Sequence, residues 1–114
     1  MTHGQLGYLQ LPADDLPRAA AFYAAVFGWT VEAGQAGFEA PGLIGQWIRD
    51  RPVSPDAGPL LWIDVARMAA ALRLVAEHGG ALLSPPVVDD GVRLLATIRD
   101  PAGNTIGVVQ HGTD

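Results

Sequence analysis

The sequence contains no cysteine and no lysine, and each absence removes a class of chemistry. Without cysteine there is no disulfide framework, no thiolate nucleophile and no Cys-ligated zinc or iron–sulfur site. Without lysine there is no Schiff base and no P-loop lysine. The seven basic side chains are all Arg and stand against twelve Asp and Glu, which gives a formal net charge of −5. Because neutralised phosphates supply most of the affinity for nucleic acid, an acidic chain without a basic stripe predicts no nucleic-acid partner.

Long apolar runs and targeting signals are lacking too. The longest strongly apolar stretch, residues 60–63, is far shorter than the roughly 20 residues of a membrane span. Residues 1–5 lack the cationic start and apolar run of a secretory signal, so we expect a cytoplasmic protein without membrane contact. The apolar share of 49% and the charged share of 17% exclude disorder and fit one domain over residues 1–114.

Two helices are predicted from apolar residues that recur every three or four positions. In the first, over about 16–27, Asp14 and Asp15 stand at the N-cap, Pro17 fits the first turn, and Gly28 is a natural left-handed end. The second runs from about 68 to 78 and stops at the glycine pair 79–80. Its start has no capping Ser, Thr, Asp or Asn, so we expect that end either to fray or to be fixed by tertiary contacts.

Strands are predicted where apolar and polar residues alternate or where aromatic and β-branched residues gather. Residues 89–91 and 100–104 have the composition of turns, with Gly103 in a left-handed position. The order of a strand, a helix and further strands occurs twice, on either side of a Pro-rich linker at 51–59. Residues 42–45 and 104–107 also match, which makes Gly45 and Gly107 equivalent. The predicted strands span 8–11, 29–33, 43–49, 60–65, 81–84, 92–99 and 105–110.

Several motifs resemble the vicinal oxygen chelate superfamily, the group of glyoxalases, bleomycin-resistance proteins and extradiol dioxygenases. They are PADDL at 12–16, AFY at 21–23, VFGW at 26–29, EHGG at 77–80, and DPAGN at 100–104 followed by IG at 106–107. The resemblance covers nearly the whole chain. It implies an α+β fold of two βαβββ modules, residues 4–51 and 59–112, that form a curved mixed sheet around a cavity with the helices outside. It also implies a homodimer.

Metal-dependent members of this superfamily chelate two substrate oxygens on a divalent cation. Their ligands are His, Gln or Glu on the first strand of each module and Glu on its last strand. Gln10 is the one usable donor at the matching positions, whereas a catalytic divalent site typically takes three protein ligands. We therefore expect no metal and no other cofactor, and we assign no catalytic residue. The matching positions are Tyr8 or Gln10, then Gly45, then Leu60 or Trp62, and then Gly107.

The remaining metal-binding side chains are scattered in the sequence. His3, His78 and His111 have no ligand spacing, and surface or capping roles suit them better. Asp64 could point into the cavity, because it shares a strand face with Trp62, or it could cap the second helix from a distance.

Strand alternation divides each strand into a face under the helices and a face toward the cavity. The cavity face is predicted to be aromatic with a few polar groups, which suits a small, partly aromatic or apolar molecule. Trp47 and Trp62 could instead fill the cavity or pack in a dimer interface, and the two glycines could mark bends where backbones approach. The predicted ligand-binding residues are Tyr8, Gln10, Gly45, Trp47, Leu60, Trp62, Thr97 and Gly107.

The sequence therefore favours a glyoxalase-like protein that binds a small molecule in a metal-free cavity. Two alternatives remain open at this point. One is a metal-dependent lyase, isomerase or dioxygenase of the same superfamily. The other is a non-catalytic interaction module with a filled cavity. Whether the protein is an enzyme is left open, although the missing ligand positions favour binding without catalysis.

Overall fold

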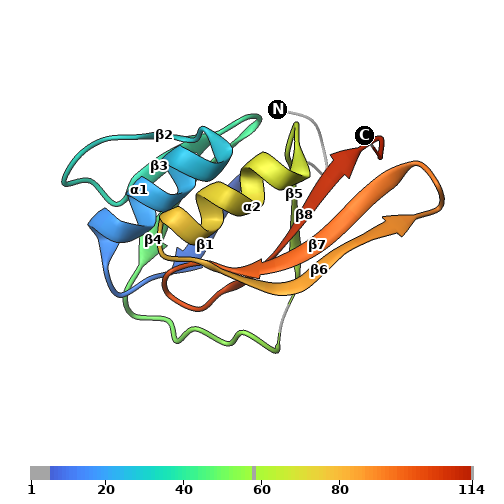
Figure 1. Ribbon diagram of the computed structural model, residues 1–114. Coiled ribbons are helices and arrows are strands. Elements are labelled where there is room, and N and C mark those ends of the chain that lie inside the picture. The colour runs from blue at the N-terminus through green and yellow to red at the C-terminus, as the bar shows by residue number, and fades with distance from the viewer. Residues whose placement is uncertain (1–5, 58, 114) are drawn as a thin grey trace.

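The computed structural model describes residues 6–57 and 59–113, and these form two βαβββ modules in chain order (Figure 1). The α+β fold with two modules is confirmed. The first module comprises β1 (Tyr8–Pro12), α1 (Leu16–Phe27), β2 (Thr30–Val31), β3 (Gly37–Ala40) and β4 (Leu43–Ile48). The second comprises β5 (Leu61–Asp64), α2 (Met68–Glu77), β6 (Ala81–Asp89), β7 (Arg93–Arg99) and β8 (Thr105–His111).

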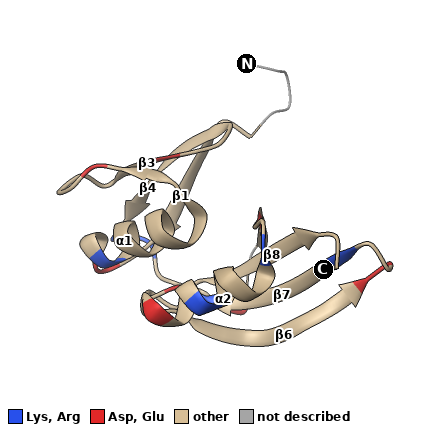
Figure 2. Ribbon diagram, turned by 45° about the horizontal axis from the view of Figure 1, so that its top comes forward, with Lys and Arg blue, Asp and Glu red and all other residues tan. Residues whose placement is uncertain are grey.

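Each module forms a mixed sheet of four strands with the same topology. The N-terminal sheet has the order β1-β4-β3-β2 and the C-terminal sheet has the order β5-β8-β7-β6. In both, the first strand pairs in parallel with the last, and the other pairs are antiparallel. Both helices lie in the angle between the sheets and contact each other (Figure 2). Each sheet therefore has a helix face and, on its other side, an open face.

Two strands differ from the sequence prediction. β3 was not predicted as a separate strand, because only four residues lie between the turns at 33–36 and 41–42. β6 continues to Asp89 through Pro85 and Pro86, although proline cannot donate to a sheet ladder. β6 is the edge strand and pairs only with β7, and its register shifts between Ser84 and Val87. An edge position and a bulge are where a sheet tolerates proline.

The two helices begin in different ways. At α1 the side chain of Asp15 accepts from the Arg18 N–H at 3.1 Å, and Gly28 ends the helix in the left-handed conformation, as predicted. At α2 no adjacent side chain caps the first turn. Instead the Met68 N–H donates to Oε1 of Gln110 on β8 at 2.6 Å. The start of α2 is thus held by a tertiary contact.

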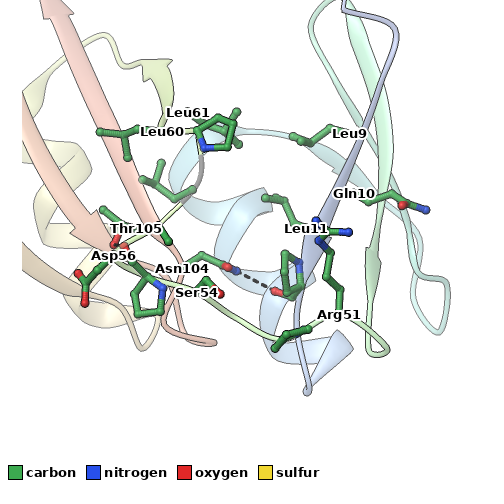
Figure 3. A pocket seen from close by; sticks show the side chains of 16 residues that line it. Leu9, Gln10, Leu11, Arg51, Ser54, Asp56, Leu60, Leu61, Asn104 and Thr105 are labelled. Atoms are coloured by element: carbon green, nitrogen blue, oxygen red, sulfur yellow. Dashed lines mark hydrogen bonds between the residues drawn. The ribbon is translucent and has the colours of Figure 1, made fainter.

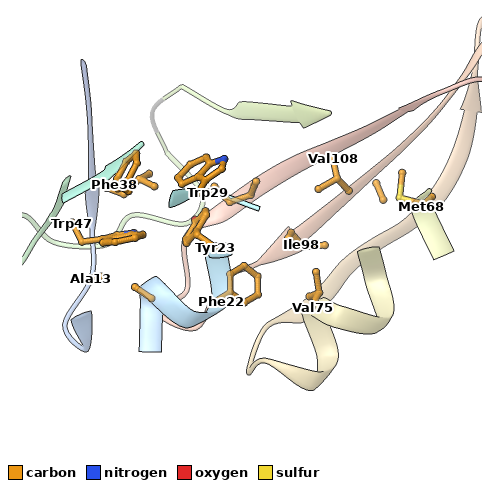
Figure 4. Packing of buried hydrophobic residues seen from close by; sticks show 14 residues of the cluster. Ala13, Phe22, Tyr23, Trp29, Phe38, Trp47, Met68, Val75, Ile98 and Val108 are labelled. Carbon is orange, nitrogen blue, oxygen red and sulfur yellow. The ribbon is translucent and has the colours of Figure 1, made fainter. Parts of the chain in front are cut away.

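An aromatic cluster between the N-terminal sheet and α1 forms much of the core (Figure 4). Tyr23 stacks on Trp29, and Trp29 stacks on Phe38, each with ring centroids 4.7 Å apart. Phe38 in turn contacts Trp47, also at 4.7 Å. Such contacts add to the stabilisation from burial alone. One face of β4 therefore packs in this cluster.

The predicted orientation of β4 is consequently wrong by one residue. Trp47 was placed in the cavity, yet its side chain is 2% exposed, whereas Ile44 is 55% exposed. The pairing of Leu11 with Trp47 places both on the helix face. Gly45 faces the core as well, where a Cβ would overlap the Phe38 ring and the Leu9 carbonyl. A slip of one residue exchanges the faces of a strand, so Gly45 and Gly107 are not equivalent.

A buried carboxylate joins the two modules. Asp100 lies in the turn between β7 and β8, and its Oδ2 accepts from the Tyr23 hydroxyl on α1 at 2.8 Å. Its Oδ1 accepts from the backbone N–H groups of residues 102–104. Asn104 donates from Nδ2 both to Asp100 and to the Pro12 carbonyl. Burial, together with the nearby Asp100 charge and its hydrogen bond, raises the pKa of Tyr23 well above its ordinary value.

Candidate ligand-binding site

Trp62 is the prominent feature of the open face of the C-terminal sheet. It lies on β5 opposite Gly107 of β8, and a Cβ at residue 107 would overlap the six-membered ring of the indole. The glycine therefore leaves room for the ring to rest on the strand. With 46% of its surface exposed, Trp62 is also available to a ligand. Gly107 was predicted to line the cavity or to mark a bend where backbones approach, and in the structure the adjacent indole is what requires a glycine.

Polar side chains continue the same row across the sheet. Thr97 on β7 lies opposite Gly107, and Ser84 on β6 lies opposite Thr97. The hydroxyls of Ser84 and Thr97 are 2.5 Å apart and hydrogen-bonded. The open face of the C-terminal sheet thus places an indole beside a glycine and two hydroxyl groups, and Thr97 lies on the predicted face.

The open face of the N-terminal sheet carries Tyr8 and Gln10, as alternation predicted for β1. Their partners on β4 are Ile44 and Gln46, which are not among the predicted ligand-binding residues. Tyr8 and Ile44 are each 55% exposed. Pairing Trp47 with Leu11 on the helix face would have predicted them, because Ile44 and Gln46 alternate with Trp47 along β4 and therefore lie on the open face. On this open face the side chains of Tyr8 and Ile44 lie beside the amide side chains of Gln10 and Gln46.

A cavity lies between the two modules, apart from the face that carries Trp62. It is a space of about 730 Å³ that separates β1 from the starts of β5 and β8, and linker residues such as Arg51, Ser54 and Asp56 form one wall (Figure 3). Gln10 and Leu60 line it, whereas the other six predicted site residues do not. Tyr8 and Gln10 lie on the N-terminal sheet, Trp62, Thr97 and Gly107 on the C-terminal sheet, and Gly45 and Trp47 face the core. The chain therefore does not gather all eight residues in one cavity.

The donor set does not fit the divalent cation that the superfamily resemblance implies. The side chains of Asp64 and His111 are 3.2 Å apart at the edge of the open face, so Asp64 faces outward rather than capping α2. His78 is occupied differently, because its Nδ1 lies 3.0 Å from the Leu74 carbonyl within α2. In residues 6–57 and 59–113 no three His, Cys, Asp or Glu side chains come together. His3 lies outside the described residues.

In the part of the chain that the structure describes, no helix is long and apolar enough to cross a bilayer.

Fold and site together define a class of protein built from paired βαβββ modules. A model of the Glyoxalase/Bleomycin resistance protein/Dioxygenase superfamily matches residues 5–108. The chain is 32% identical to a glyoxylase-like domain-containing protein of Didymella fabae over 117 residues, which cover 90% of this chain and 91% of that protein. The chain belongs to the glyoxalase/bleomycin resistance protein/dioxygenase superfamily.

Solved structures show the same fold at lower identity. A glyoxalase-related enzyme of Fulvimarina pelagi superposes with a TM-score of 0.76 at 20% identity, covering 95% of this chain and 88% of its own. A glyoxalase/bleomycin resistance protein/dioxygenase family enzyme of Burkholderia phytofirmans gives 0.75 at 17% identity, covering 91% and 96%. At these identities the likeness concerns the fold.

Proposed function

We propose that this protein binds a small, partly aromatic or apolar molecule without a metal ion, on the open face around Trp62. The observation that carries the proposal is the position of the Trp62 indole, which rests on Gly107 and keeps 46% of its surface exposed. A flat ligand can stack on such a ring. Hydrogen bonds to Thr97 and Ser84 would orient it, as a few polar groups do in apolar sites.

The arrangement of the two tryptophans weighs against a filled-cavity interaction module. Trp47 is buried in the aromatic core, and Trp62 lies on the open face of the other sheet. Hence the two rings do not collapse onto each other. For the metal-dependent alternative, Asp64 and His111 form a pair of donors, but no third His, Cys, Asp or Glu in the described chain joins them.

A homodimer and a cytoplasmic location, both expected from the sequence, are part of the proposal. The hairpin formed by β6 and β7 supports the dimer, because it exposes a group of apolar side chains with no charge between residues 81 and 88. Exposed apolar side chains gathered on one element favour an interaction site. Pro85 and Pro86 remove two N–H donors from the edge, which favours packing by side chains over strand addition. The exposed residues are Leu82, Leu83, Val87, Val88 and Val92.

Replacing the indole tests the binding site. We expect Trp62→Ala to weaken binding of the neutral aromatic probes indole and 2-naphthol about tenfold, because the stacking surface is lost. The free energy of unfolding should change by only about 1 kcal/mol or less, since the side chain is half-exposed. Isothermal titration calorimetry and urea denaturation measure the two quantities. Trp62→Phe should retain most of the affinity.

Leu6→Ala is the matched control, because it truncates another exposed apolar side chain, outside the proposed binding site and the β6–β7 hairpin. It should leave probe binding unchanged. A loss of stability in Trp62→Ala with unchanged affinity would contradict the proposal. A stoichiometric divalent cation bound at Asp64 and His111 in the purified protein would favour the metal-dependent alternative instead.

A further inference from the structure

The cavity between the modules is a second candidate site, separate from the open face around Trp62. Its volume of about 730 Å³ lies within the range of small-molecule pockets. Leu9 and Leu11 of β1 form one wall and Leu60 and Leu61 the opposite wall (Figure 3). Ile106 of β8 also lines the cavity. Much of this surface is apolar, so it suits a hydrocarbon group.

Three of the six polar side chains that line the cavity have partners within the protein. Asn104 donates to the Pro12 carbonyl at 2.7 Å, and the Thr105 hydroxyl donates to the Pro55 carbonyl at 2.7 Å. The carboxylate of Asp56 lies 3.4 Å from the guanidinium of Arg99. The contacts of Pro55 and Asp56 hold the linker against β8 and β7, and these three paired side chains have little left to offer a ligand.

Arg51 is the charged side chain among the remaining three, which are Gln10, Arg51 and Ser54. It lines the cavity, and within residues 6–57 and 59–113 its guanidinium has no ion pair and no side-chain hydrogen bond. Arg51 also lines an adjoining space of about 420 Å³ together with Gln10, Ser54 and Asp50. The other charged residue that lines the larger cavity, Asp56, is paired with Arg99, so within the described residues Arg51 is the unpaired charge of that lining. A guanidinium favours planar anions, which it can bind through two parallel hydrogen bonds.

We propose that the cavity between the modules binds a small carboxylate with an apolar body. The carboxylate pairs with Arg51 at the linker, and the hydrocarbon part lies between the leucines of β1 and those at the start of β5. Gln10 and Ser54, which line both spaces beside Arg51, supply further hydrogen bonds. The site does not depend on the stacking surface at Trp62.

The test uses octanoate and its neutral counterpart octanamide as probes, with affinity measured by isothermal titration calorimetry at pH 7. We expect octanoate to bind wild type about tenfold more tightly than octanamide, because only the carboxylate pairs with the guanidinium. Arg51→Gln should remove this preference. Arg73→Gln is the matched control, since it removes one exposed Arg from α2 and changes the net charge equally.

Further variants separate the two sites and the other possible occupants. Octanoate affinity should be unchanged in Trp62→Ala, so failure of the stacking proposal and failure of this one are distinguishable. No octanoate binding by wild type, or an equal loss in Arg51→Gln and Arg73→Gln, would overturn the proposal. A change of oligomeric state in Arg51→Gln without octanoate binding would also overturn it, because a second copy would then occupy the cavity.

Discussion

At the scale of single residues, the Asp100 carboxylate shows how one buried charge is accommodated. Its exposure is only 4%, yet both oxygens accept hydrogen bonds from the turn, from Asn104 and from the Tyr23 hydroxyl. A buried charge without such partners would cost several kcal/mol. The turn at residues 100–104 was predicted from sequence, whereas the contribution of Tyr23 was not, because 77 positions separate it from Asp100.

Removing the Tyr23 hydroxyl tests this network. We expect Tyr23→Phe to lower the free energy of unfolding by about 1–3 kcal/mol, since the buried carboxylate loses a donor. Urea denaturation at neutral pH measures it. Tyr8→Phe is the matched control, because Tyr8 is 55% exposed. An equal effect of the two substitutions would contradict the assigned role.

The same side chain makes stability depend on alkaline pH. The folded state raises the pKa of Tyr23 because of burial and the nearby Asp100. The unfolded chain loses this proton near pH 10, whereas the folded chain keeps it at higher pH. The stabilising contribution is therefore complete below about pH 10, and it is lost as pH rises from there toward the folded-state pKa, by up to about 1.4 kcal/mol per pH unit. In unfolding measured from pH 8 upward, Tyr23→Phe should lack this decline.

At the scale of elements, local sequence decided both ends of α1 but did not show what holds the start of α2. Asp15, Pro17 and Gly28 begin and end α1 with contacts inside the segment, so a sequence pattern reveals them. The acceptor for the start of α2 is Gln110, which lies 42 positions away on β8.

The orientation of β4 could not be predicted from its sequence for a different reason. Both of its faces carry apolar residues, so periodicity predicted a strand without showing which face Trp47 occupies.

The starts of α1 and α2 should be destabilised by substitutions in different parts of the chain. We expect Gln110→Ala to cost about 1–3 kcal/mol, because the buried Met68 N–H loses its acceptor. Amide hydrogen exchange should then increase in the first turn of α2 and stay unchanged in α1. Asp15→Ala should cost about 1 kcal/mol and increase exchange in α1 instead. Gln35→Ala, at an exposed position, is the control. Unchanged exchange in α2 of Gln110→Ala would show that another contact holds its start.

At the scale of the whole molecule, the chain packs its two modules through their helices and leaves both sheets with open faces (Figure 2). The predicted cavity residues are consequently divided between two sheets, and a groove lies between the modules. The exposed apolar hairpin of β6 and β7 completes a surface that a second copy could cover, since homodimers pair the same patch on both subunits.

A charge on the hairpin tests the proposed dimer. We expect wild type to sediment as a dimer and Val88→Arg to shift it toward monomer, because burying an unpaired guanidinium in an apolar interface is unfavourable. Sedimentation velocity over a range of concentrations measures this. Ala76→Arg places the same charge on the exposed surface of α2 and should leave the dimer intact. A monomeric wild type would contradict the proposed dimer.

The sequence by itself determined the excluded chemistries, the two helices, most strands, the turns and the family, because these depend on residue types and on periodicities within short segments. Tertiary structure decided that Trp47 packs in the core while Trp62 stays exposed, that Gln110 holds α2, and that an unpaired Arg51 borders a cavity between the modules. Which face of a strand is buried, and which residues far apart in the sequence come into contact, depend on which surfaces meet when the chain folds. A one-dimensional pattern records both faces of a strand but does not say which one will be buried.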